Sequence, residues 1–88
     1  MKDSCYRSVC TAVAQYFDVD PNQVKPYHYL RRDWGLDRLE LQWIARQVTA
    51  AEGIEARETT DLESAETIGH LIQILRARKH AWLMSLPS

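Results

Sequence analysis

The spacing of the apolar residues constrains the fold of this chain more than any other feature, because it follows the period of a helix. Between residues 37 and 51, Leu41, Ile44, Ala45 and Val48 recur at i, i+3, i+4 and i+7, which places them on one helix face. No stretch of useful length alternates polar and apolar residues as a strand does. The chain is therefore expected to be all-α.

Helices are predicted over residues 4–17, 37–51, 60–65 and 67–78, and a long loop over residues 18–36 separates the first two. The other residues expected to face the core are Tyr6, Val9, Val13, Phe17, Val19, Val24, Leu30, Leu62, Ile68, Leu71, Ile72 and Leu75. Each helix alone buries too little apolar surface to be stable. The predicted fold is thus a small four-helix bundle with three longer helices and one short one.

Polar residues at the helix ends support these boundaries. Asp3 or Ser4 can cap the first helix, and Asp37 followed by Glu40 has the spacing of a capping box for the second. Gly53 is well placed to end that second helix. The last helix is expected to end near residue 78, so the chain divides into a helical domain, 1–80, and an apolar tail, 81–88.

The charge balance excludes some classes of protein. The 88 residues, enough for one domain, contain 11 basic and 12 acidic side chains. This balance argues against nucleic acid as a partner, because such proteins usually carry a surplus of basic residues. No apolar run is long enough to span a membrane, and the N-terminus lacks the form of a signal peptide. A cytoplasmic location is expected.

Neither a disulfide nor a metal site is predicted. Cys5 and Cys10 lie on one predicted helix with their Cα atoms about 8 Å apart, beyond the reach of a disulfide. Reduced thiols, one or both partly buried, are expected. His28, His70 and His80 do not combine with the cysteines at a familiar metal-ligand spacing.

One motif resembles that of a known family. The stretch Asp33-Trp34-Gly35-Leu36-Asp37-Arg38-Leu39 is similar to the Asp-Leu-Gly-x-Asp-Ser-Leu motif of acyl carrier proteins. The order of the helices and the spacing from Val19 to Leu39 also resemble that family, over roughly residues 6–76. The resemblance implies the same helical fold, with Asp33, Gly35, Asp37 and Leu39 forming the motif.

The departure from the family is at Arg38. The resemblance implies that this position should hold the serine to which phosphopantetheine is attached. A guanidinium has no hydroxyl and stays charged at all working pH values. No phosphopantetheine cofactor is therefore expected. Ser64, in Leu62-Glu63-Ser64-Ala65, lacks the motif and is a poor substitute.

The second predicted helix has a second apolar face. Leu39 and Trp43 lie about 160° from Leu41 on a helical wheel, and Ala50 continues their row, with Arg46 beside it. Two interpretations remain open. In the first, the row is exposed by chance or is covered by the tail. In the second, the row binds a protein partner, because Trp and Arg are favoured interface residues. The resemblance favours the second, since this helix is the docking surface of acyl carrier proteins. The partner would then be a carrier-recognising enzyme, although the family's acidic helix is here nearly balanced.

Arg38 has three possible roles. It can be a surface arginine paired with Asp37 or Glu40, part of an anion site with the free N–H groups of the helix start, or a protein contact. No nucleophile, base and orienting group converge, so no catalytic residue and no enzyme activity are predicted. The acidic run Glu55, Glu58, Asp61 and Glu63 is expected to be a solvated face, and His70 a surface or boundary residue.

Three functions follow from these observations. The first is a non-acylated interaction module that docks through its second helix to a partner of lipid or polyketide-type metabolism. The second is a divergent acyl carrier protein that is modified elsewhere or holds its cargo non-covalently. The third is a helical subunit that oligomerises through the 81–88 tail, and the chain is expected to be a monomer or a weak homo-oligomer.

Overall fold

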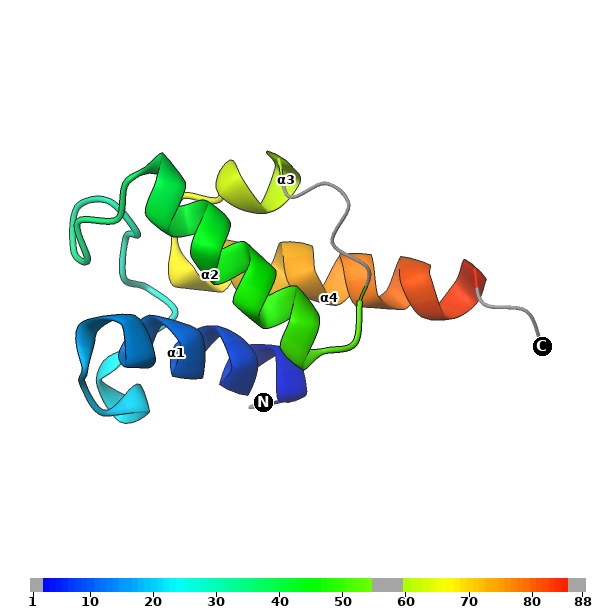
Figure 1. Cartoon of the computed structure of the whole chain (residues 1–88), viewed down its shortest axis with the longest axis horizontal. Coiled ribbons are helices and arrows are strands. Elements are labelled where there is room, and N and C mark those ends of the chain that lie inside the picture. Colours follow the sequence, from blue (N-terminus) through cyan, green and yellow to red (C-terminus); the bar gives the residue numbers. More distant parts are fainter. Residues whose placement is uncertain (1–2, 55–59, 86–88) are drawn as a thin grey trace.

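The computed structural model describes residues 3–54 and 60–85, which are mostly helical (Figure 1). The elements in chain order are α1 (Ser4–Phe17), the 3-10 turn η1 (Pro21–Gln23), α2 (Arg38–Ala51), α3 (Thr60–Glu63) and α4 (Ile68–Ser85). Within those residues there are three longer helices, one short helix and no strand. The predicted all-α bundle with a long first loop is therefore confirmed.

Local chemistry fixes the ends of α1. The Asp3 carboxylate accepts a hydrogen bond from the Tyr6 N–H at 2.9 Å, so Asp3 and not Ser4 is the N-cap. After the last turn, Asp18 adopts a left-handed conformation with φ 55°, and its N–H bonds back to the carbonyls of Ala14 and Gln15. The predicted range of this helix, 4–17, is confirmed.

The long loop before α2 is packed against the bundle. Its backbone bonds to the start of α4, with the Leu30 N–H donating to the Glu66 carbonyl and the Ile68 N–H donating to the His28 carbonyl, both at 2.9 Å. The buried side chains of the loop are Val24, Leu30 and Leu36. A connection of this length is stable here because both its backbone and its apolar residues have partners within the domain.

The start of α2 has the predicted capping box. The Asp37 carboxylate accepts from the Glu40 N–H at 2.8 Å, while the Glu40 carboxylate accepts from the Asp37 N–H at 3.0 Å. Gly53 follows the helix with φ 69°, as expected of a stop signal. The predicted inward stripe of Leu41, Ile44, Ala45 and Val48 is fully buried.

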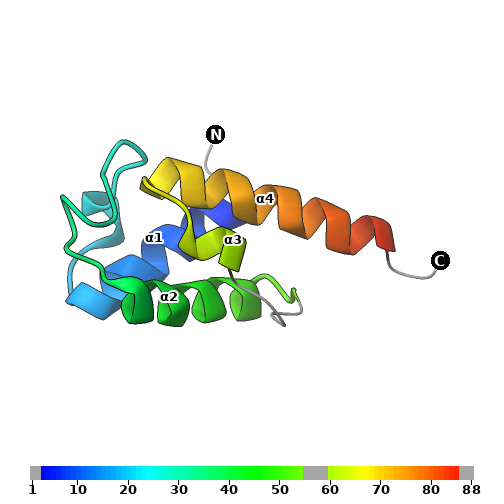
Figure 2. The ribbon, with the colours of Figure 1, turned by 90° about the horizontal axis from the view of Figure 1, so that it is seen from above.

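The core lies between α2 and α4, which are bridged by the other two helices. Both α1 and α3 pack against α2 and also against α4, and Figure 2 shows α2 and α4 on opposite sides of the molecule. Of the other residues predicted to face inward, the fully buried ones are Val9, Val13, Val24, Leu30, Leu62, Ile68, Leu71, Ile72 and Leu75. Tyr6, Phe17 and Val19 are partly buried against that core.

The predicted end of the last helix near residue 78 is wrong, because α4 continues to Ser85. No glycine or proline stands between Lys79 and Ser85 to stop it, and Trp82 still packs against the core. The described part of the tail, 81–85, is thus the end of α4, and residues 86–88 lie outside the described residues. Figure 1 shows α4 extending away from the other helices, so residues 81–85 do not fold back over α2.

Candidate functional site

The second apolar face of α2 is exposed. Leu39 is 74% exposed and Trp43 is 40% exposed, and the side chains of Arg46 and Ala50 also face outwards. The Trp43 ring lies 5.4 Å from the ring of Tyr16 on α1, which widens the apolar surface beyond one helix. We refer to Leu39, Trp43, Arg46 and Ala50 as the α2 ridge.

Arg38 pairs with α3 and not with its own helix start. Its side chain is 78% exposed, and its Nε lies 3.5 Å from a carboxylate oxygen of Glu63. The expected pairing of Arg38 with Asp37 or Glu40 is therefore wrong. The physical reason is that these two carboxylates accept each other's backbone N–H groups in the capping box. Exposed ion pairs of this kind contribute little to stability.

The start of α2 is not an open anion site. The Asp37 carboxylate accepts the N–H of Glu40, so a negative charge already stands at the positive end of the helix dipole. The Glu40 carboxylate also accepts a hydrogen bond from the Tyr16 hydroxyl, and this bond raises the pKa of the tyrosine. An added phosphate would meet two carboxylates here, which disfavours the anion-site interpretation of Arg38.

The other motif residues have structural roles of their own. Asp33 accepts a hydrogen bond from the Tyr29 N–H at 2.6 Å and holds the turn before α2. Gly35 has φ 65°, a conformation that favours glycine. Leu36 is buried, and Leu39 belongs to the α2 ridge. The motif thus builds the loop and the helix start whether or not position 38 can hold a cofactor.

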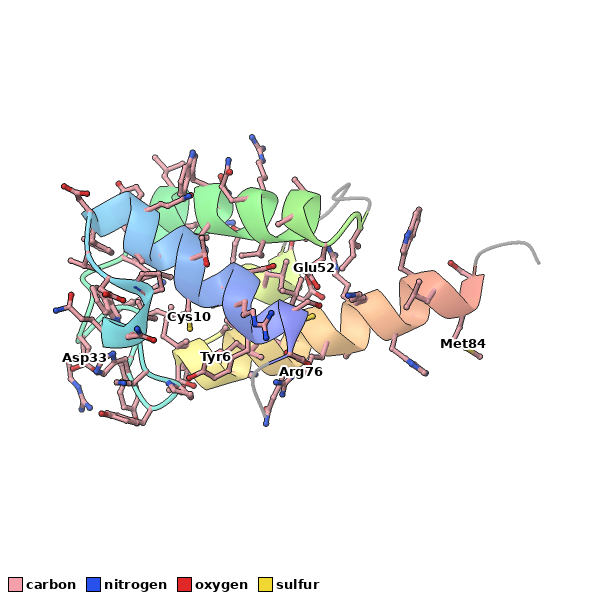
Figure 3. All side chains as sticks on the ribbon, turned by 90° about the horizontal axis from the view of Figure 1, so that it is seen from below. Tyr6, Cys10, Asp33, Glu52, Arg76 and Met84 are labelled. Atoms are coloured by element: carbon pink, nitrogen blue, oxygen red, sulfur yellow. The ribbon has the colours of Figure 1, made fainter. Side chains whose placement is uncertain are left out.

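A cluster of polar side chains around one buried carboxylate lies at the opposite end of α2 (Figure 3). The sequence did not predict this cluster. The side chain of Glu52, at the C-cap, is only 5% exposed and lies where α1, α2 and α4 meet. Its two oxygens accept from the hydroxyls of Ser4 at 2.7 Å and Ser8 at 2.6 Å, from the Lys79 ammonium at 3.0 Å and from the Cys5 thiol at 3.4 Å. These five residues form the Glu52 cluster.

The cluster holds Glu52 in its charged form. Burial disfavours the charge and would raise the pKa, but the donors from Ser4, Ser8, Lys79 and Cys5 outweigh burial and lower the pKa to about 2. Burial, followed by the hydrogen bond to Glu52, raises the pKa of the Cys5 thiol to about 11. Cys5 and Cys10 are both free and fully buried, which is deeper than the partial burial that was expected.

The cluster contains the residue types of a nucleophile and a base, but in the wrong protonation states. Lys79 Nζ lies 3.0 Å from Ser4 Oγ, yet the hydrogen bond to Glu52 raises the pKa of Lys79, so its amine stays protonated and cannot accept a proton. The Ser4 hydroxyl already donates to Glu52. The arrangement joins three helices through one shared carboxylate.

The basic residues of α4 are each paired with a carboxylate from another element. Arg76 contacts Asp3 at 2.7 Å and lowers the pKa of that carboxyl to about 2, and Arg78 contacts Asp61 at 3.2 Å. Asp61 and Glu63 of the predicted acidic run are thus in ion pairs, while Glu55 and Glu58 lie outside the described residues. The expected solvated face is wrong at Glu63, whose side chain is only 11% exposed, whereas Asp61 is half exposed.

His70 is exposed, as predicted. Over residues 3–54 and 60–85, no group of three or more metal-ligating side chains comes together. In the same residues, none of the helices has the length and apolar character needed to span a bilayer. The largest exposed apolar side chains outside the loop are those of the α2 ridge with Tyr16, and those at the end of α4.

Comparison with protein-family models, curated proteins and solved structures gives no match for this chain. The resemblance to acyl carrier proteins therefore rests on the motif, on the loop spacing and on the order of the helices.

Proposed function

We propose that this chain is an acyl-carrier-like interaction module of the cytoplasm that lacks phosphopantetheine and has no enzymatic activity. It docks through the α2 ridge to a protein of lipid or polyketide-type metabolism. The observation that carries the proposal is the exposed Leu39 and Trp43 pair beside Arg38, at the helix start where the resembled family holds its cofactor.

The composition of the ridge suits a protein interface. Trp and Arg are enriched among the residues that dominate binding energy, and Trp43 and Arg46 are neighbours on the exposed face of α2. Covering a leucine as exposed as Leu39 contributes about 1.5–3 kcal/mol to binding. Tyr16, whose ring is tilted by 58° against that of Trp43, widens the contact across two helices.

The charges around the ridge define the partner's chemistry. Asp37 and Glu40 are held in the capping box, whereas Arg38 and Arg46 are exposed. Because Arg38 is paired with Glu63 and Asp37 is itself exposed, the cation that lies outwards beside the apolar row is Arg46. A complementary partner surface has an apolar pocket rimmed by carboxylates. In the resembled family the helix is acidic and its partners are basic, so a partner of this chain would differ from them in charge.

A photocrosslinking experiment tests the docking surface. The chain is produced with the photoreactive residue p-benzoylphenylalanine in place of Trp43, and a matched control carries it in place of Tyr27, which is also exposed but lies in the loop. We expect one adduct that forms at position 43 and not at position 27. The partner found in that adduct is then purified on its own, and its affinity for the unmodified chain is measured.

Variants of the purified chain decide the outcome. Leu39→Ser and Arg46→Glu should each weaken binding at least tenfold, while Glu66→Gln, on an exposed residue outside α2, should leave it unchanged. The absence of an adduct from position 43, equal adducts from both positions, or binding that is insensitive to both ridge variants would refute the proposal.

A further inference from the structure

Two imidazoles lie where the long loop is attached to the start of α4. The backbone of residues 26–30 is bonded there to that of residues 66–69 by three hydrogen bonds, one of 2.8 Å and two of 2.9 Å. Figure 2 shows this part of the loop beside the first turn of α4. We refer to the two bonded segments, 26–30 and 66–69, as the loop clasp.

The Nδ1 atom of His28 accepts two hydrogen bonds from the loop itself. The donors are the Lys25 N–H and the Trp34 indole N–H, each at 3.2 Å. The Trp34 ring lies 5.7 Å from the imidazole and 5.2 Å from the ring of Phe17 on α1. His28 therefore ties the two ends of segment 25–34 together, and through Trp34 it holds that segment against α1.

The Nδ1 atom of His70 is also an acceptor, at the start of α4. It accepts from the Glu66 N–H at 3.4 Å, while the His70 N–H donates to the Thr67 hydroxyl at 3.0 Å. These two reciprocal bonds have the form of a helix cap. The Glu66 carbonyl accepts from the Leu30 N–H, so His70 supports the same residue to which the loop is attached.

All three side-chain bonds require neutral imidazoles. A ring nitrogen of histidine accepts a hydrogen bond only when it carries no hydrogen, so both histidines hold theirs on Nε2. A proton added at Nδ1 would face the N–H groups of Lys25 and Trp34 in His28, or that of Glu66 in His70, and the bonds would be lost. Histidine ordinarily changes its charge between about pH 5 and pH 8.

We propose that the loop clasp is a pH-sensitive device, closed by neutral His28 and His70 and opened locally when they take up a proton. Since only the neutral imidazoles can accept, the closed clasp is favoured at higher pH and becomes less stable as the pH falls. Leu30 is fully buried and does not titrate, so it keeps the clasp closed in most molecules. Acid therefore raises the frequency of local opening while the helices stay folded.

The neighbouring charges do not compensate for the lost bonds. Neither imidazole forms an ion pair with a carboxylate of the described residues, and α1 meets this region through the uncharged Phe17. His70 lies in the first turn of α4, where the helix dipole disfavours a cation. Segments 25–34 and 66–70 hold three cations against two carboxylates, which opposes a further positive charge. Besides the two histidines, their titratable and charged residues are Lys25, Tyr27, Tyr29, Arg31, Arg32, Asp33 and Glu66.

Hydrogen exchange of the full chain, followed by NMR at pH 7.5 and pH 5.5, tests the proposal. The rates are corrected for the intrinsic pH dependence of amide exchange, so that they report how often each amide opens. We expect the Leu30 and Ile68 amides to open at least tenfold more often at pH 5.5, because two titrating groups favour the open clasp. The Val48 amide, within α2, should change less than twofold. Long-range proton–nitrogen spectra at pH 8 should place the hydrogen of both imidazoles on Nε2.

Asparagine gives a matched variant of each histidine. Its Oδ1 accepts hydrogen bonds near the place of Nδ1 and does not titrate. The double variant His28→Asn/His70→Asn should reduce the pH effect at the Leu30 amide to less than threefold. The control His80→Asn, at the exposed end of α4, should leave the effect as it is in the wild type.

Three results would overturn the proposal. These are a hydrogen on Nδ1 of either imidazole at pH 8, equal changes of the Leu30 and Val48 amides, or a pH effect that survives in the double variant. If the double variant does not fold, the spectra and the exchange of the wild-type chain decide the question by themselves. None of these measurements involves a partner, so their outcome is separate from docking through the α2 ridge.

Discussion

Replacing Glu52 with glutamine should destabilise the domain strongly, although the change is isosteric. The substitution keeps the shape of the side chain and removes its charge. The Ser4 and Ser8 hydroxyls and the Lys79 ammonium then face a neutral amide at a side chain that is 5% exposed. Breaking a buried, hydrogen-bonded charge pair typically costs about 3–5 kcal/mol.

The lowered pKa of Glu52 leads to a similar magnitude. The folded-state pKa is about 2 against an ordinary value of 4.5. Since one pKa unit corresponds to about 1.4 kcal/mol, the charged form contributes about 3 kcal/mol at neutral pH. For a domain of this size, the melting temperature should fall by about 10–20 °C.

The pH dependence has a defined sign. Because folding lowers the pKa of Glu52, its contribution is fully present above pH 4.5 and is lost as the pH falls from there towards 2. The wild-type chain should therefore lose stability through this window. Glu52→Gln should lose less, so that the two chains converge near pH 2.

Urea unfolding followed by circular dichroism, from pH 7 to pH 2, measures both quantities. Glu66→Gln, on an exposed glutamate, serves as the matched control and should follow the wild type at every pH. A loss below about 1 kcal/mol for Glu52→Gln at pH 7, or a difference from wild type that does not shrink below pH 4.5, would refute the role assigned to this cluster.

Three further predictions concern the cap, the core and the thiols. Asp37→Ala removes the capping box of α2 and should cost about 0.5–2 kcal/mol in urea unfolding; no measurable loss would mean that the box contributes nothing. Leu75→Ala, in the core, should cost about 2–5 kcal/mol, whereas Leu83→Ala at the exposed end of the same helix should change monomer stability by less than about 0.5 kcal/mol; equal losses would contradict the two burial states. With its pKa raised to about 11, the Cys5 thiol is ionised in about one molecule in a thousand at pH 8 and should react with a maleimide far more slowly in the folded chain than in urea; equal rates would contradict its burial.

The helices and their buried faces could be predicted because each is amphipathic with a clear period. The ends of α2 were predicted from the capping pair Asp37 and Glu40 and from Gly53, and the structure has the same ends. The predicted end of α4 was wrong because Arg78 and Lys79 are residue types that are common at the C-terminal end of a helix. Their charges instead pair laterally with other elements, and Trp82 extends the packed face beyond them.

The contacts between elements could not be predicted in the same way. The Glu52 cluster joins residues that are more than 25 positions apart, and no local pattern marks a glutamate that will be buried by two serines and a lysine. The pairing of Arg38 with Glu63 likewise depends on how α3 lies beside α2. The exposed face of α2, by contrast, was predictable, because Leu39 and Trp43 lie opposite the buried stripe.

The proposal that this chain carries no phosphopantetheine arm is tested most directly by intact-mass spectrometry. The chain is co-expressed with a broad-specificity phosphopantetheinyl transferase, alongside the variant Arg38→Ser. The account predicts that the wild-type chain keeps its unmodified mass and that Arg38→Ser gains one phosphopantetheine group. A wild-type chain carrying the group on any residue would contradict the account, and an Arg38→Ser variant that stays unmodified would contradict the proposed likeness to acyl carrier proteins.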